Sequence, residues 1–196
     1  MKKKILVLFL AATLGVTSLV GCAKSDVTLN NQQSTGIENS ENNDGVVAEK
    51  SVEAIRKAVV DAYGDKYLAT MSLSKEEINE RFGLTDDMYK DAVADIPAMS
   101  THVDTFVAVE AKEGKVNEVF DALTEYRDML INDTMMYPMN ELKTQSSEVY
   151  KYDDYVFFIM LGGYDDSLEE DSELLAYYED QNDIAKNIID DMLNTK

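Results

Sequence analysis

Residues 102–111 read His-Val-Asp-Thr-Phe-Val-Ala-Val-Glu-Ala, with β-branched residues at every second position. In an extended chain those side chains would share one face, which is typical of a β-strand. They are Val103, Thr105, Val107 and Val109. Gly114 ends this pattern, and over residues 116–130 apolar side chains recur instead at helical spacing. The sequence therefore predicts a strand followed directly by an amphipathic helix.

Two further apolar segments, residues 147–152 and 155–161, flank Asp153-Asp154. This arrangement predicts an antiparallel hairpin, although Asp-Asp is a weaker turn signal than Asp-Gly. The second segment, Tyr-Val-Phe-Phe-Ile-Met-Leu, is apolar on both faces, which favours a central strand. We therefore expect an α+β fold: a small antiparallel sheet with a strand–helix–strand–strand core and helices packed mainly on one face.

Capping residues and periodicity predict helices outside this core. Helices are expected over residues 51–63, over residues 74–83 after a capping box, and over residues 85–96 before Pro97. A last helix fits the apolar spacing of residues 174–192. The segment around Tyr137-Pro138 is expected to be a loop.

The N-terminus has the pattern of an export signal. A basic start (Met1-Lys2-Lys3-Lys4) precedes sixteen apolar or small residues, 5–20. The run ends in Leu19, Val20, Gly21 and Cys22. This ending resembles the lipobox of bacterial lipoproteins, which implies a signal peptide over residues 1–21, cleavage before Cys22 and lipidation of its thiol. The alternative is a free cysteine at the end of a transmembrane anchor.

Composition sets the expected organisation and excludes one class of partner. Residues 22–48 are polar and aperiodic, which predicts a disordered tether after the lipidated cysteine. We expect a single domain over residues 49–165, then an acidic segment and C-terminal helix over residues 166–196. Without the three lysines of residues 1–21, 15 basic residues face 38 acidic ones, a net charge of about −23. This charge excludes nucleic acid as a partner.

Three segments together resemble a known family. Residues 100–114 (STHVDTFVAVEAKEG), 137–140 (YPMN) and 154–163 (DYVFFIMLGG) look like a domain of unknown function that occurs in small lipoproteins of Gram-positive anaerobes. The likeness covers roughly residues 52–165. It implies a lipid-anchored protein on the extracytoplasmic face of the cell membrane, and it assigns no activity and no catalytic residue.

The chemistry-bearing residues give little support for catalysis or for a cofactor. His102 is the chain's single histidine, and in a strand Ser100, Thr101 and Asp104 would not form a catalytic triad with it. With Cys22 lipidated, no zinc or iron site of the usual composition can be built. The acidic run of residues 165–173 lacks the spacing of a calcium loop, so weak Ca²⁺ association is the most it predicts. We therefore assign no catalytic residues, no cofactor and no metal site.

Two segments are candidates for a binding edge, provided that they lie at the same end of the sheet. The first is Tyr137, Pro138, Met139 and Asn140, and the second is Gly162, Gly163 and Tyr164. Tyrosine and methionine suit adaptable contact surfaces. We expect a non-catalytic module that binds an envelope protein or a small ligand at the cell surface. The alternative is an envelope hydrolase that uses paired carboxylates.

Overall fold

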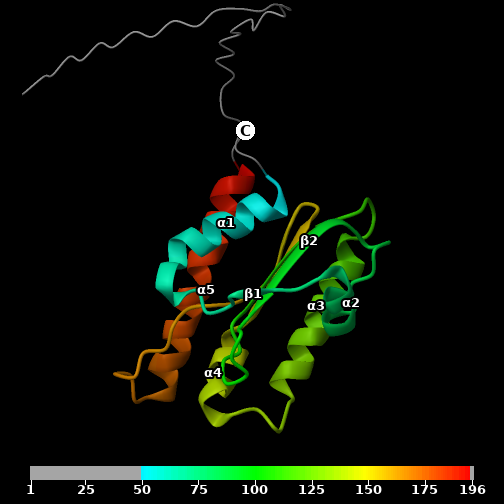
Figure 1. The fold of residues 1–196 in the computed structure, drawn as a ribbon. Coiled ribbons are helices and arrows are strands. Elements are labelled where there is room, and N and C mark those ends of the chain that lie inside the picture. The colour runs from blue at the N-terminus through cyan, green and yellow to red at the C-terminus, as the bar shows by residue number, and fades with distance from the viewer. Residues whose placement is uncertain (1–49, 195–196) are drawn as a thin grey trace, which may run out of the picture. The chain divides into compact units, whose positions relative to one another are not determined.

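The structure, a computed structural model, describes residues 50–194 (Figure 1). An antiparallel sheet of five strands has the order β1-β2-β3-β5-β4. The strands are β1 (Met71–Ser72), β2 (Tyr89–Ile96), β3 (Thr105–Ala111), β4 (Glu148–Tyr152) and β5 (Tyr155–Met160). The helices are α1 (Val52–Tyr63), α2 (Lys75–Phe82), α3 (Val116–Ile131), α4 (Pro138–Ser146) and α5 (Asp171–Asn194), with a 3₁₀ turn at Gly64–Lys66. The α+β class is confirmed.

The predicted strand–helix–strand–strand core is present. β3 lies in the middle of the sheet, pairs with β5 (Val107 opposite Phe158) and is followed by α3. The β4–β5 hairpin turns at the predicted position, where Tyr152 pairs with Tyr155. Asp153 adopts a left-handed φ of 48°, which aspartate tolerates better than most residues, so the weak turn signal sufficed.

Helices cover both faces of the sheet, so the expectation that they pack mainly on one face is wrong. Figure 1 shows α1 and α5 on one side and α2 and α3 on the other. Alternate residues of the central strands supply the two cores, Phe106 and Phe157 toward α1 and α5, and Val107 and Phe158 toward α2 and α3. Because β3 and β5 are apolar on both faces, each face must be covered.

The segment expected as a helix over residues 85–96 instead contains β2. The Thr85 hydroxyl donates a hydrogen bond to the Asp87 carboxylate within a local turn. In the sequence alone, the residues of this turn resemble a helix N-cap. From Tyr89 onward the chain pairs with β3, with one register irregularity near Asp91. Pairing with a central strand therefore overrides the helical spacing of its few apolar residues.

Two C-terminal features extend the expected organisation. The segment after Tyr137 forms α4, with Pro138 at its first position, where the missing N–H is not needed. α5 buries Ala185, Ile189 and Leu193 against α1 and the sheet. The helix of the expected segment 166–196 is therefore part of the same compact unit as the residues before it.

Candidate functional site

Two adjoining hollows form a groove between α2, α3 and the loop of residues 97–103. The hollow beside the loop has a volume of about 410 Å³ and is lined in part by Met99 and His102, and the hollow between the helices has about 560 Å³ and is lined in part by Met129. Both share the lining residues Met71, Arg81, Ile96, Tyr126 and Leu130. We call them the loop-side and helix-side hollows and together the methionine groove.

Exposed methionines form the rim of this groove. Met71, Met99 and Met129 are 44%, 59% and 57% exposed, whereas Met160 is buried at the loop-side hollow. Methionine is flexible and polarizable, and it recurs on surfaces that adapt to apolar partners. A single exposed apolar side chain is ordinary, whereas several that gather at one hollow indicate an interaction surface.

Arg81, in the last turn of α2, is the cation of the groove. The chain has three arginines, and the other two are held: Arg56 donates to Asp95 at 2.6 Å and Arg127 donates to the Ser147 carbonyl at 2.6 Å. Arg81 is exposed and forms no hydrogen bond or close ion pair within the described residues, although, with the Ser74 hydrogen bonds, its charge one helical turn away helps to lower the pKa of the Glu77 carboxyl. Its fork of five N–H donors is therefore free to bind a carboxylate.

A buried ion pair lies near the loop-side hollow. The Lys143 Nζ donates to Asp104 Oδ1 at 2.7 Å and to the Gly162 carbonyl, and it lies 4.8 Å from the ring centre of Tyr164. Both charged side chains are fully buried. Burial raises the pKa of the Asp104 carboxyl and lowers the pKa of the Lys143 amine, and their mutual attraction opposes both shifts. The pair joins α4 to the start of β3 and to the segment after β5.

Two buried polar atoms at this end of the sheet have no hydrogen-bond partner among the described residues. They are His102 Nδ1 and Asp104 Oδ2. The His102 ring contacts the Tyr164 ring, with centroids 5.5 Å apart, and it also lines the loop-side hollow. Buried polar groups are nearly always paired, so an unpaired imidazole nitrogen beside a hollow is unusual.

The two segments expected as a binding edge meet in the structure. The Tyr164 hydroxyl donates to Asn140 Oδ1 at 2.8 Å, and Asn140 Nδ2 donates to the Thr101 carbonyl at 3.0 Å. Asn140 is fully buried, so it joins segments rather than facing a ligand. Tyr137 and Met139 are 55% and 63% exposed, which leaves them as the accessible apolar part of this edge.

The glycines and Pro138 of the expected edge have local structural roles. Gly162 has a φ of +98°, and a Cβ built on it would lie 2.5 Å from the Gln181 Cβ. Only glycine fits there, because both the backbone conformation and the contact with α5 exclude a side chain. Gly163 passes the side chain of Lys66, and Pro138 is exposed at the start of α4.

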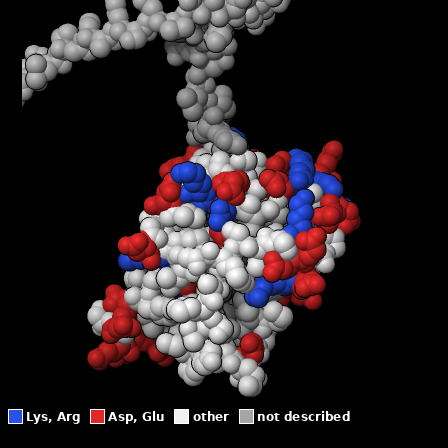
Figure 2. All heavy atoms as spheres, viewed as in Figure 1, with Lys and Arg blue, Asp and Glu red and all other residues white. Residues whose placement is uncertain are grey.

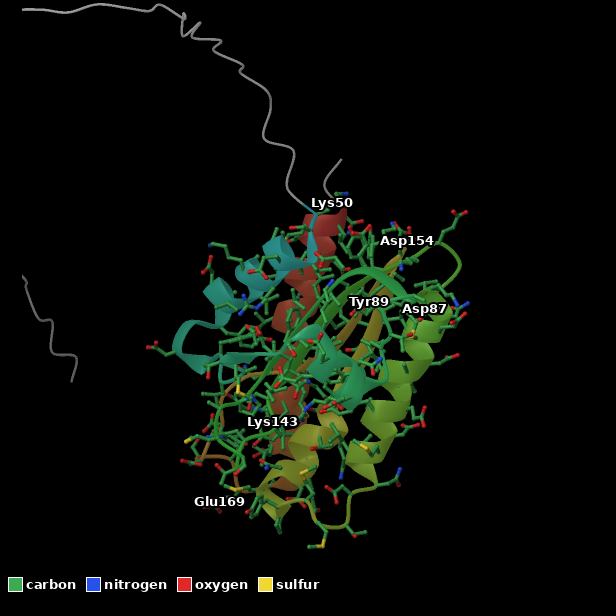
Figure 3. The ribbon with its side chains drawn as sticks, turned by 45° about the vertical axis from the view of Figure 1, so that its right-hand side comes forward. Lys50, Asp87, Tyr89, Lys143, Asp154 and Glu169 are labelled. Carbon is green, nitrogen blue, oxygen red and sulfur yellow. The ribbon has the colours of Figure 1, made fainter. Side chains whose placement is uncertain are left out.

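The sequence reasoning missed the residues that line the groove. Arg81 and Met129 lie on predicted helices, but nothing in either helix pattern shows that the two side chains share a hollow. Met99 lies two residues after Pro97 in a segment without periodicity, and the proline is the one local sign that this segment is a loop. Figure 3 shows Lys143 in the lower half of the domain, in the segment that the sequence suggested was a loop.

Several expected features cannot be placed. Cys22 and its flanking residues Leu19, Val20 and Gly21 lie outside the described residues. Across residues 50–194, the structure contains no helix that is both long and apolar enough to cross a membrane. In the same part of the chain, no three His, Cys, Asp or Glu side chains gather closely enough to hold a metal ion. Ca²⁺ association at residues 165–173 stays a prediction.

Comparison with known families gives one match. Residues 62–161 match the family described as a domain of unknown function (DUF4358). The matched range contains every residue named above in the lining of the methionine groove, whereas nearly all of α1 and the whole of α5 lie outside it. Comparisons with curated proteins and with solved structures gave no match.

Proposed function

The chain belongs to the DUF4358 family of domains of unknown function, and we propose that it is a non-catalytic binding module held at the cell surface by a lipid on Cys22. In this proposal the methionine groove receives an apolar segment of a partner protein of the envelope. The observation that carries the proposal is the groove itself, with three exposed methionines on its rim.

The shape of the groove supports a peptide segment over a small molecule. Small-molecule sites enclose most of the ligand surface, whereas the methionine groove is open along its length. Open apolar grooves commonly bind a helix or an extended segment of another protein through a few anchoring side chains. Methionines along the rim would let the groove adapt to those anchors.

Charged side chains are distributed unevenly over the surface of the domain. The chain has a formal net charge of −20, yet Figure 2 shows a broad area of the lower face with few Asp, Glu, Lys or Arg side chains. In Figures 1 and 3, α4 lies toward this lower end and Lys50 at the opposite end. Lys50 donates to the Leu193 carbonyl, so the chain enters the domain beside the end of α5.

The buried carboxylates favour binding over the hydrolase alternative. A glycosidase needs two carboxyl groups that converge on one bond and remain free to exchange protons. Asp95 and Asp104 are the buried acids of the described residues, and each is held by its own basic partner, Arg56 or Lys143. Asp95 also accepts hydrogen bonds from the Tyr67 and Ser72 hydroxyls. Each of the two carboxylates is therefore engaged in its own ion pair, an arrangement that favours a structural role over catalysis.

Site-specific photo-crosslinking in living cells tests the proposal. A photoreactive residue at Met99 in the full chain should give a discrete adduct with an envelope protein, and Met129→Glu in the same chain should abolish it. Ile184, 38% exposed on α5, is the matched position away from the groove. Adducts that form equally from Ile184, or that survive Met129→Glu, would refute the groove as the binding surface.

A further inference from the structure

We infer that the segment bound in the methionine groove carries a carboxylate, which binds Arg81 in the loop-side hollow that His102 also lines. The inference rests on the proposed function and adds the chemistry of the partner. The binding group would be an acidic side chain flanked by apolar anchors.

The loop-side hollow differs in charge from the rest of the protein. The chain has 38 acidic residues, but none of those in the described part lines this hollow. Arg81 is the permanently charged side chain of its lining, and His102 adds an imidazole ring to the same lining. In an acidic protein, an acid-free apolar hollow with a free arginine has the charge that suits an anionic group.

The geometry of Arg81 makes a carboxylate the fitting anion. A guanidinium binds a carboxylate through two parallel N–H···O bonds, and such charge-assisted bonds are about twice as strong as neutral ones. The apolar side chains of Met71, Ile96 and Tyr126 in the same lining would make the surroundings of that contact less polar and so strengthen it. The imidazole ring of His102 adds a further polar group to the lining of the same hollow.

The helix-side hollow gives the bound segment a direction. Glu77 and Glu80 line this hollow, and Glu125 lines the adjoining surface next to Arg81. These acids would repel a second carboxylate, so the acidic residue of the partner belongs at the loop side. The rest of the segment should be apolar or basic where it passes α2. A uniformly acidic peptide would therefore bind poorly.

An unbiased selection tests this inference. A phage library of random 12-residue peptides is panned against the full chain held in lipid nanodiscs. We expect the enriched peptides to combine apolar residues with one Asp or Glu. Synthetic copies in which that residue becomes Asn or Gln should bind at least about tenfold more weakly, the loss expected from one charge-assisted contact. Arg81→Gln should remove the difference between the acidic and amide peptides.

Matched variants separate the possible failures. Lys75→Gln, also on α2 and exposed, should keep the acidic preference, whereas His102→Gln should reduce it. Groove peptides without an acid, or equal binding of acidic and amide copies, would overturn the carboxylate inference and leave the groove intact. No enrichment, or peptides that Met129→Glu does not displace, would overturn the proposed function itself. A concentration-dependent dimer that Arg81→Gln dissociates would make a second copy of the chain the occupant and refute a partner peptide.

Discussion

Lys143 on α4 and Asp104 at the start of β3 form an ion pair with Nζ and Oδ1 2.7 Å apart, and neither side chain has any exposed surface. The ammonium also donates to the Gly162 carbonyl and faces the rings of Tyr164 and Tyr178. One buried cation thus connects α4, the sheet and the segment that leads to α5. These contacts satisfy the Lys143 amine so fully that a structural role accounts for it.

Removing the cation should destabilise the domain strongly. Lys143→Met leaves the Asp104 carboxylate buried without its partner, which typically costs about 3–5 kcal/mol of unfolding free energy. The pKa of Asp104 is already raised by burial, and loss of the ammonium should raise it further. When a carboxyl has a higher pKa in the folded state than in the unfolded state, the folded protein loses stability as the pH rises through the folded-state pKa. Urea unfolding of the variant should therefore show a larger deficit at pH 8 than at pH 5.

The control for this prediction replaces both partners. Lys143→Met with Asp104→Leu removes the charge that the single change strands, so the double variant should be more stable than Lys143→Met alone. If the double variant is the less stable of the two, the cost of Lys143→Met comes from lost packing and not from an unpaired carboxylate.

Asn140 should matter for stability although it lies in a segment expected to bind a ligand. Asn140→Leu removes the amide that accepts from Tyr164 and donates to the Thr101 carbonyl, and leaves both groups unpaired. Both hydrogen bonds are partly buried, so losing them should cost about 1 kcal/mol each and lower the melting temperature by several degrees. Met139→Leu, the exposed neighbour, should leave the melting temperature unchanged. Equal effects of the two changes would show that the amide network contributes nothing.

Periodicity predicted the parts of the fold in which one residue pattern decides the structure. β3, α3 and the β4–β5 hairpin each have an apolar spacing that fits one type of element. The apolar spacing of β2 does not decide its structure, because it is short. β2 is stabilised instead by pairing with β3, a contact between separate segments that local spacing does not show. Both faces of β5 were predicted to be buried, and this alone required helices on both sides of the sheet.

The site was less predictable because it depends on contacts between distant segments. The meeting of Asn140 and Tyr164 followed from their places near the ends of elements, but the burial of Asn140 did not. Lys143 gave no sign that it would be buried, since lysine is almost always exposed. Arg81 lies on a correctly predicted helix, and only its position across from Met99 and Met129 gives it a role.

The hydrogen bond from Tyr150 to Asp190 should make stability sensitive to alkali. Burial and the Asp190 carboxylate raise the pKa of the Tyr150 hydroxyl to about 12, above its ordinary value of 10. The stability from this neutral hydroxyl is complete below pH 10 and is lost as pH rises through the folded-state pKa. Tyr150→Phe should lower the unfolding free energy at pH 9 by about 1 kcal/mol. It should also lose less stability than the parent chain between pH 9 and pH 11.

Urea unfolding at the two pH values measures both effects. Tyr152, which donates to Asn194 at the end of α5, provides the matched tyrosine, because its hydroxyl bonds to a neutral amide and not to a carboxylate. An identical loss in the parent chain and in Tyr150→Phe would mean that other groups carry the alkaline sensitivity.

Cys22→Ser should separate anchoring from folding. If the thiol carries the lipid, the variant should accumulate as uncleaved precursor or be shed, as shown by cell fractionation and by the mass of the protein. A fragment of residues 49–196 should keep the circular dichroism of the parent, because it contains all the described helices and strands. A Cys22→Ser variant that stays with the membrane at its mature mass would contradict the lipid anchor.

Phe158 on β5 should contribute more to stability than any exposed residue. Its side chain is fully buried, its backbone position lies between Val107 on β3 and Val149 on β4, and its ring meets the Tyr126 ring edge-on with centroids 5.3 Å apart. Phe158→Ala leaves a cavity between the sheet and α3, and buried aromatic truncations cost about 3–5 kcal/mol. A domain of this size has about 5–15 kcal/mol in total, so urea unfolding should shift to a much lower midpoint.

Glu169→Ala provides the contrast, because this side chain is exposed and precedes α5. Exposed substitutions of this kind change stability by less than about 0.5 kcal/mol. Removing one negative charge from a chain with a formal net charge of −20 should, if anything, relieve repulsion. Comparing the urea unfolding midpoints of Phe158→Ala and Glu169→Ala shows whether Phe158 belongs to the core. A Phe158→Ala variant as stable as Glu169→Ala would mean that the face of the sheet under α3 does not hold the domain together, and the groove beside Tyr126 would then lack a rigid floor.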